Sequence, residues 1–319
     1  MGLAIKGKKV IGLVLNGKKI LGLATNGKVI WRFVIASNPW QFNVDSDVAS
    51  VAVDSSGNVY AGTSSKSVYK LDSSGKQVWK FAADSTVWSV AVDSSGNVYA
   101  GTYGHSVYKL NTSGNQVWKF AADNTVYSVA VDSSDNVYAG TSSKSVYKLD
   151  SSGKQVWKFA ADSTVWSVAV DSSGNVYAGT SSRSVYKLDS SGKQVWKFAA
   201  DNTVYSVAVD SSDNVYAGTY GIIFAGHSVY KLNTSGNQVW KFAADSTVDS
   251  VAVDSSGNVY AGTYGHSVYK LNTSGNQVWK FAADNTVHSV AVDSSGNVYA
   301  GTDSYSVYKL TPDGSNTAT

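Results

Sequence analysis

The chain of 319 residues contains no cysteine, only two prolines and one methionine. The absence of cysteine excludes a disulfide framework, a thiolate metal site and a cysteine nucleophile. No apolar run of about 18 residues occurs, so we expect no membrane span. Lys6, Lys8 and Lys9 interrupt the first apolar residues, and no h-region of a secretory signal follows them. We therefore expect synthesis in the cytoplasm.

What the chain has in quantity is glycine, with 29 residues, and aromatic side chains, with 10 Trp, 20 Tyr and 9 Phe. No long segment shows helical periodicity, and this composition favours many strands joined by tight turns. Charge is distributed unevenly. Residues 1–35 carry seven Lys or Arg and no acid, which leaves −4 for the remainder of a chain whose total is +3. A basic segment of this kind suits nucleic acid or an anionic surface, but lysines also block further pairing at sheet edges, so we do not favour nucleic acid as a partner.

Residues 1–38 contain a repeat of ten residues: GLAIKGKKVI, GLVLNGKKIL and GLATNGKVIW. Two of these repeats hold an Asn-Gly pair, the strongest short signal for a hairpin. We expect a β-meander with strands near 2–5, 8–15, 18–25 and 28–35. A sheet this small with two apolar faces is marginal alone, so we expect this arm to dock on a partner or to form a homo-oligomer or a larger assembly. The arm resembles the NGK-type strand repeats of tail and structural proteins of phages that infect Gram-positive bacteria.

From Val48 onward the chain repeats a unit of about 39 residues seven times. The Asp of its SVAVD motif falls at Asp54, Asp93, Asp132, Asp171, Asp210, Asp254 and Asp293. Each unit contains four short apolar segments, which we name strands a to d; in the second copy they are 87–93, 97–102, 106–110 and 116–122. Four strands per 39 residues is the period of a β-propeller blade.

The two ends of the repeat region complement each other. The seventh copy ends after strand c at Leu310, and a strand d without the rest of its blade, beginning at Trp40, precedes the first copy. We therefore predict an all-β, closed seven-bladed β-propeller at residues 39–312, in which residues 39–45 complete the last blade, and a flexible tail at 313–319. An open β-solenoid is the less favoured architecture, since its ends would need caps.

The segment VYAGTSSKSVYKLDSSGKQVWKF, residues 59–81, resembles the PQQ-like or quinoprotein-type propeller repeat, and VAVDSSGNVY is similar to the NHL-type repeat. The resemblance covers residues 39–310 and implies the propeller fold. Two departures concern the Trp-docking contact of the quinoprotein repeat: Lys70 stands where that repeat has Ala, and the turn before Trp79 is one residue shorter. The sequence leaves open whether the contact is kept. No cluster suited to a quinone and calcium breaks the symmetry, so we expect no cofactor.

Comparison of the seven copies with one another shows two highly variable positions. The first precedes SVAVD and the second ends the b–c loop. Because d–a and b–c connections emerge on the same face of a blade, we predict one ligand-binding face. Its predicted residues are Trp88, Tyr127, Trp166, Tyr205, Asp249 and His288 from the first position; His105, Arg183, His227, His266 and Tyr305 from the second; and Tyr103, Tyr264 and Phe224 from the b–c loops. Neutral drift at loosely packed positions is the alternative explanation.

No combination of residues identifies a reaction. His105, His227 and His266 occupy one repeat position in different blades, too dispersed for one metal ion. Asp249 and His288 occupy neighbouring blades and would pair, but no unique nucleophile accompanies them. We expect no catalytic residue, no metal and no enzyme activity. The favoured function is a binding module that presents an aromatic-rich face to a glycan or protein ligand, with phage-type surface attachment as one setting. The alternatives are a recently amplified or engineered repeat scaffold without a specific ligand, and a quinoprotein-like oxidoreductase.

Overall fold

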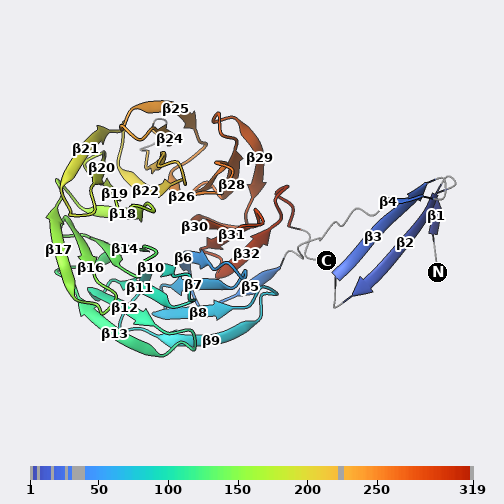
Figure 1. The fold of residues 1–319 in the computed structure, drawn as a ribbon, viewed down its shortest axis with the longest axis horizontal. Helices are drawn as coiled ribbons and strands as arrows, with labels where there is room; N and C mark the ends of the chain where they lie inside the picture. Colours follow the sequence, from blue (N-terminus) through green and yellow to red (C-terminus); the bar gives the residue numbers. More distant parts are fainter. Residues whose placement is uncertain are drawn as a thin grey trace.

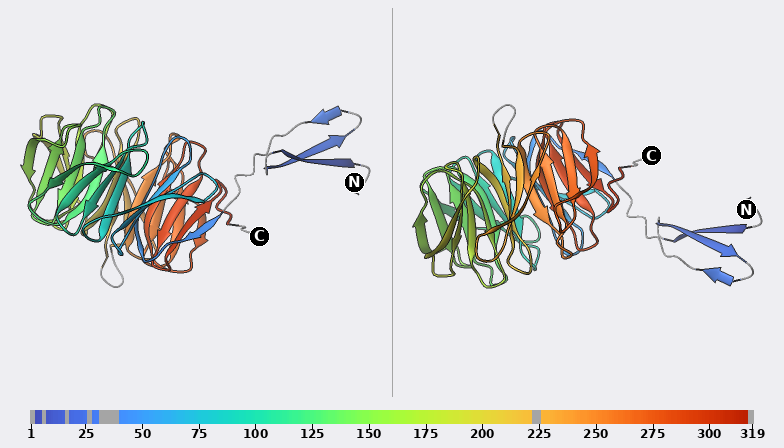
Figure 2. Two further views of the ribbon diagram at one scale, coloured as in Figure 1. Left: turned by 90° about the horizontal axis from the view of Figure 1, so that it is seen from below. Right: turned by 90° about the horizontal axis from the view of Figure 1, so that it is seen from above.

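The computed structural model describes residues 3–5, 8–15, 18–25, 28–30, 40–221 and 226–316. In the repeat region, seven four-stranded antiparallel sheets surround a central axis, as Figure 1 shows. The views of Figure 2 show this ring edge-on as a broad disc. The expected all-β, seven-bladed propeller is therefore confirmed. No helix among these residues is long and apolar enough to cross a membrane.

Each blade follows chain order from strand a at the axis to strand d at the rim. The strands are β6 (Val48–Val53), β7 (Val59–Thr63), β8 (Ser67–Leu71) and β9 (Gln77–Ala82) in blade 1; β10 (Val87–Val92), β11 (Val98–Thr102), β12 (Ser106–Leu110) and β13 (Gln116–Ala121) in blade 2; β14 (Val126–Val131), β15 (Val137–Thr141), β16 (Ser145–Leu149) and β17 (Gln155–Ala160) in blade 3; β18 (Val165–Val170), β19 (Val176–Thr180), β20 (Ser184–Leu188) and β21 (Gln194–Ala199) in blade 4.

The remaining blades continue this order. They contain β22 (Val204–Val209), β23 (Val215–Thr219), β24 (Ser228–Leu232) and β25 (Gln238–Ala243) in blade 5; β26 (Val248–Val253), β27 (Val259–Thr263), β28 (Ser267–Leu271) and β29 (Gln277–Ala282) in blade 6; and β30 (Val287–Val292), β31 (Val298–Thr302), β32 (Ser306–Leu310) and β5 (Gln41–Asn43) in blade 7. The strands of blade 2 agree with the predicted ranges to within one residue at each end.

The arm forms a separate four-stranded meander in the order β1 (Leu3–Ile5), β2 (Lys8–Leu15), β3 (Lys18–Thr25) and β4 (Lys28–Ile30). These strands match the predicted ones, although residues 31–35 of the fourth prediction lie outside the described part of the chain. Docking or oligomerisation through the arm stays a prediction.

The ring closes where the sequence predicted. Strand β5 pairs antiparallel with β32, so that Phe42 lies opposite Val307, and Figure 1 shows the two strands side by side. After β32, a turn from Thr311 to Ser315 takes the place of the c–d turn of the other blades. This turn reaches Ser315, so residues 313–315 of the predicted tail belong to a hydrogen-bonded turn. The domain boundary at 312 stays a prediction, and residues 317–319 of the tail lie outside the described residues.

Neighbouring blades pack face to face through seven equivalent hydrophobic clusters. Between blades 1 and 2, Tyr60 and Val68 pack against Val87, Val98 and Leu110, all without exposed surface. The second strand, VYAGT, is buried at every residue in every blade. Such a strand has neighbours on both faces, which explains why its residues are apolar or small without alternation.

A ring of hydrogen bonds joins the innermost strands. Strand a has a neighbouring strand on one side only, so some of its N–H groups find no partner within their own blade. The hydroxyl of Ser50 in blade 1 accepts a hydrogen bond from the backbone N–H of Val90 in blade 2, at 3.0 Å. The same contact recurs from blade to blade and ends with the N–H of Val51 donating to Ser289 at 2.9 Å. The repeated Ser of SVAVD thereby links all seven blades around the axis.

The repeated Trp of strand d makes the docking contact that the sequence left open. The indole N–H of Trp79 donates to the carbonyl of Thr112 in the next blade at 3.0 Å. The ring lies against Gly114 of that turn, where an added Cβ would be 2.8 Å from the indole Cδ2. Lys70 does not prevent this contact, because its ammonium group lies over the ring of Tyr60, 5.3 Å from the centroid. All seven Trp residues of strand d dock in this way, and the contact between Trp40 and Gly75 includes the closing strand.

In six of the seven blades, an ion pair holds strand d to the connection that enters the blade. Lys119 bonds to Asp84 at 2.9 Å, and five other blades have the same pair. In the closing blade Gln41 takes the place of the lysine and donates to Ser306 at 2.8 Å. The equivalent acid, Asp284, is exposed. The closing strand, which has three residues rather than six, therefore lacks one contact that its counterparts have.

We predict that Gly114→Ala destabilises the propeller more than Gly96→Ala. Both glycines have positive φ, 81° and 83°, so either substitution costs about 1 kcal/mol of backbone strain. Only the Cβ at residue 114 meets a tryptophan; at residue 96 the nearest atom is 3.5 Å away. We expect about 1–3 kcal/mol of additional loss from that overlap, measured by urea denaturation of both variants. Equal losses would contradict the docking contact.

We also predict that Gln41→Lys stabilises the ring. The new ammonium group would meet Asp284 as Lys119 meets Asp84, a surface pair expected to contribute up to about 1 kcal/mol. The measurement is the free energy of unfolding at low salt. In an Asp284→Asn background the same substitution should bring no gain, and a gain that persists there would refute the pairing.

Candidate functional site

The first variable position is the second residue of each strand a. In β10 the pairing with β11 passes from Val87 to Ser89 with a shift in register, so Trp88 has no partner across the sheet, and all seven blades show this bulge. A residue at a bulge forms no regular backbone pairing with the neighbouring strand, so its side chain can point in a different direction. The bulge therefore explains how one position accommodates Ala49, Trp88, Tyr127, Trp166, Tyr205, Asp249 and His288.

Four of these residues form a continuous row of rings across blades 2–5. The ring centroids of Trp88 and Tyr127 are 6.0 Å apart, those of Tyr127 and Trp166 are 4.3 Å apart in a stacked arrangement, and those of Trp166 and Tyr205 are 4.9 Å apart. Tyr205 then meets Tyr220 of the b–c loop at 5.1 Å. We call these five residues the aromatic arc. Trp88 at one end is 40% exposed and Tyr220 at the other end 39%.

Tyr220 was not among the predicted site residues. It occupies the same place in its blade as Tyr103 and Tyr264, directly after the strand-b Thr, but the five-residue insertion that follows it obscures the correspondence. An alignment anchored on the VYAGT segment identifies it. The contact between Tyr205 and Tyr220 also confirms that the d–a and b–c connections meet on one face of the ring.

The other two variable residues of strand a form a polar cluster in blades 6 and 7. His288 lies with its Nδ1 3.1 Å from Asp249 and its Nε2 2.6 Å from Asp303. Although burial opposes the charged form, the two carboxylates raise the pKa of His288. Burial raises the pKa of Asp249 as well. We call these three residues the Asp–His–Asp cluster; the sequence predicted the pairing of Asp249 with His288 but not the contribution of Asp303.

In this cluster neither ring nitrogen of His288 is free to accept a proton from another group. A base must offer a free nitrogen to the proton that it removes. Both ring nitrogens of His288 already face a carboxylate oxygen. The cluster instead acts as an electrostatic contact between the inner strands of blades 6 and 7.

The last residue of the b–c turn has a left-handed backbone conformation in six blades. These residues are Lys66, His105, Lys144, Arg183, His266 and Tyr305, with φ between 61° and 70°. In the c–d turns of the opposite face the residue with positive φ is always glycine, and in the a–b turns it is glycine in five blades and Asp135 or Asp213 in the other two. The b–c turns therefore carry long side chains where the backbone conformation favours glycine.

The remaining predicted residues have varied environments. Tyr103, Tyr264 and Tyr305 are exposed by 57%, 61% and 51%. His227 is half-buried, and its Nδ1 has no partner among the described residues. Phe224 lies outside the described residues. The structure thus brings Trp88, Tyr127, Trp166 and Tyr205 together, and Asp249 with His288, but it does not gather the histidines at 105, 227 and 266.

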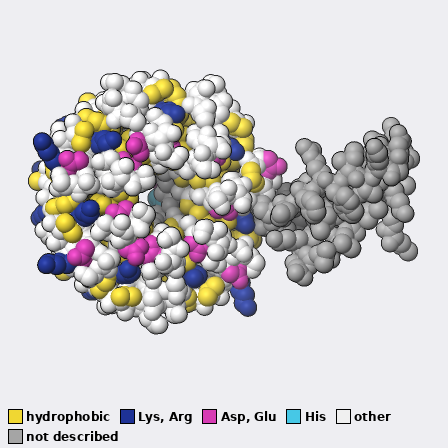
Figure 3. Space-filling model, in the orientation of Figure 1, with side chains coloured by type: hydrophobic (Ala, Val, Ile, Leu, Met, Phe, Trp, Pro, Cys, Tyr) yellow, Lys and Arg dark blue, Asp and Glu magenta, His cyan; other side chains and the backbone are white. Residues whose placement is uncertain are grey.

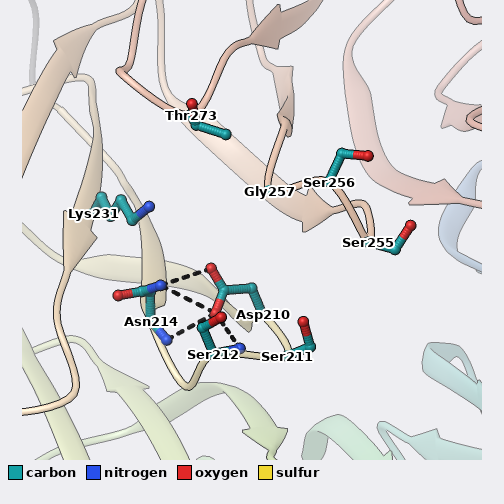
Figure 4. Close-up of a pocket in the computed structure, with 9 residues that line it drawn as sticks. All are labelled: Asp210, Ser211, Ser212, Asn214, Lys231, Ser255, Ser256, Gly257 and Thr273. Atoms are coloured by element: carbon teal, nitrogen blue, oxygen red, sulfur yellow. Dashed lines mark hydrogen bonds between the residues drawn. The ribbon is translucent and has the colours of Figure 1, made fainter.

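The opposite face has small polar grooves between blades. One, of about 210 Å³, lies between blades 5 and 6 and is lined by Asp210, Asn214, Lys231 and the Ser-rich turn at 255–257 (Figure 4). The carboxylate of Asp210 accepts from the N–H groups of Ser212 and Asn214, from the Asn214 amide and from the Tyr216 hydroxyl. Although burial opposes this, these bonds hold the pKa of Asp210 below its ordinary value.

A carboxylate with four donors has little capacity left for a ligand, so we interpret the DSSGN and DSSDN turns as hairpin structure.

Figure 3 shows the central hollow of the ring and the Asp, Lys and Arg side chains spaced around it on one face. No group of three or more His, Asp or Glu side chains in the described part of the chain is placed to hold a metal ion.

We predict that the Asp–His–Asp cluster makes stability depend on pH. Because its pKa is higher in the folded than in the unfolded protein, His288 contributes stability that is complete below about pH 6.5 and is lost as pH rises through the raised value. The melting temperature of the wild type should therefore exceed that of His288→Gln most at pH 6 and least at pH 9. A difference that is constant over this range would show that the imidazolium contributes nothing.

Comparison with known proteins agrees with this architecture. A family model of PQQ-like repeats, described as outer membrane protein assembly factor BamB, matches residues 17–158, 142–246 and 225–317. No match was found among the curated proteins. The matched segments extend over nearly the whole chain and include all seven blades. The chain therefore belongs to the family of PQQ-like β-propellers that this model of outer membrane protein assembly factor BamB represents.

Proposed function

We propose that this propeller is a binding module and that its aromatic arc binds the sugar rings of a glycan. The observation that carries the proposal is the continuity of the arc, in which five rings from four neighbouring blades follow one another at 4.3–6.0 Å. The seven-blade ring is then a rigid frame for residues carried by its bulges.

The chemistry of the arc supports a glycan. The C–H faces of a sugar ring are apolar and slightly positive, and they complement the negative face of an indole or phenol ring. Trp88 and Tyr220 are the exposed ends of the arc, and exposed aromatic residues grouped on one face mark binding surfaces. The indole N–H of Trp166, which is buried and has no partner among the described residues, is a donor within the arc.

A repeat scaffold that holds a protein partner is the second candidate. The near identity of the seven copies and the family description as an assembly factor favour it. Tyr, Trp and Arg are also enriched at protein interfaces, so a protein partner would use the same face of the ring. Attachment to a host surface as part of a phage rests on the arm alone and stays a prediction.

We do not propose an enzyme. Both nitrogens of His288 are occupied, and the Asp residues of the a–b turns are saturated with hydrogen bonds from their own hairpins. These observations favour binding over catalysis.

The test is a glycan array probed with the full-length protein and two variants. Trp88→Ala combined with Trp166→Ala removes two rings of the arc, and we expect at least a tenfold loss of binding, as for central aromatic residues in other interfaces. Tyr264→Ala, which removes an exposed ring in blade 6 outside the arc, is the matched control and should bind as the wild type does. Equal binding by the double variant and the wild type, or no glycan bound by the wild type, would refute the proposal.

A further inference from the structure

We propose that the glycan bound at the arc is acidic, and that Lys144 and Arg183 bind its carboxylate, sulfate or phosphate groups. This inference rests on the proposed function and adds the charge of the ligand. It depends on three features of the b–c turns: their backbone conformation, the absence of ion pairs at these two cations among the described residues, and their place in the two blades that carry the centre of the arc.

The backbone conformation indicates that these side chains are present for their chemistry. Lys144 and Arg183 have φ values of 70° and 66°, a conformation that costs a residue with a Cβ about 1 kcal/mol or more. The same chain places glycine at all seven positive-φ positions of its c–d turns. Glycine at these two positions of the b–c turns would remove the same backbone strain, yet the chain has Lys144 and Arg183 there.

Both cations are exposed and unpaired among the residues that the structure describes. The lysines of strand d, such as Lys158 and Lys197, bond to the aspartates of the d–a connections at 2.8 and 2.7 Å. Neither Lys144 nor Arg183 takes part in an ion pair of this kind. An exposed cation without a carboxylate partner is free to bind an anion, and the planar guanidinium of Arg183 suits a carboxylate or a sulfate in bidentate geometry.

The position of the two cations connects them to the arc. Each b–c turn begins at a Thr that pairs with the residue directly before the bulge: Thr141 with Val126, next to Tyr127, and Thr180 with Val165, next to Trp166. Lys144 and Arg183 follow these threonines by three residues. They therefore stand in the same two blades as the stacked pair of rings at the centre of the arc, Tyr127 and Trp166.

The d–a aspartates of blades 3 and 4 are each paired with a lysine of strand d, whereas two carboxylates of the same face share one histidine in blades 6 and 7. Asp249 and Asp303 of the Asp–His–Asp cluster belong to blades 6 and 7, whereas the two cations belong to blades 3 and 4. An acidic chain that extends from the arc over the b–c turns of blades 3 and 4 would meet these cations and would be repelled from blades 6 and 7. The polarity of the face thus selects both the charge of the glycan and the sector in which it binds.

The experiment measures binding of the full-length protein to matched neutral and acidic glycans, namely cellohexaose, its C6-oxidised glucuronic acid form and its C6-sulfated form, together with paired neutral and acidic members of the array. We expect the acidic members to bind at least tenfold more tightly at 50 mM salt, with the preference shrinking at 500 mM salt as screening increases. Lys144→Gly combined with Arg183→Gly should reduce that preference by tenfold or more without lowering the melting temperature, because glycine relaxes both turns.

Lys66→Gly is the matched control. Lys66 has the same charge, turn and φ, but its blade carries Ala49 at the bulge and lies outside the arc, so this variant should keep the preference. Equal binding of neutral and acidic members, each abolished by loss of Trp88 and Trp166, would overturn the inference and leave the proposed function intact. A loss in Lys66→Gly as large as in the double variant would overturn the assignment to blades 3 and 4. Binding of no glycan at all would overturn both proposals.

Discussion

The stability and closure of this ring depend on the contacts between each blade and the next. The contact between an indole of strand d and a glycine turn of the following blade recurs seven times, together with a buried hydrophobic cluster and a hydrogen bond from a backbone N–H to a serine hydroxyl. Because a four-stranded sheet cannot bury both faces alone, each blade is stable only between two neighbours. The ring must therefore close, and the short strand β5, followed by residues that enter blade 1, provides that closure.

The sequence predicted the fold to within one or two residues per strand because the repeat supplies its own internal comparison. Seven copies of one pattern fix the strand boundaries, and the missing strand d at one end with its counterpart at the other fixes the closure. The Trp-docking contact could not be settled in this way. It joins Trp79 to Gly114, two residues that are distant in sequence, and it depends on the path that Lys70 takes over Tyr60.

The place of the variable positions in the fold was predictable from the sequence, but the arrangement of their side chains was not. Variation among copies identified the bulge position, and propeller geometry assigned it to the face of the b–c loops. The pattern could not show that the rings of Trp88, Tyr127, Trp166 and Tyr205 each contact the ring in the next blade. It also could not show that both ring nitrogens of His288 contact a carboxylate. Contacts of this kind are set by side-chain rotamers across blade boundaries, and a repeat period carries no information about them.

Turns on both faces of the ring contain a residue with positive φ, but the c–d turns always have glycine there and six b–c turns do not. This contrast explains which positions of a repeat protein are free to carry functional side chains. In the c–d turns the indole of the preceding blade fills the space where a Cβ would be, so glycine is required there by packing as well as by φ. In the b–c turns φ is also positive, between 61° and 70° in six blades, but these side chains are exposed to solvent, so each costs only local strain. The bulge of strand a is similarly free of pairing. Substitutions in the repeat unit therefore cost little stability at these two positions and more at almost every other position. For this reason, sequence variation among the seven copies is concentrated on one face of the ring.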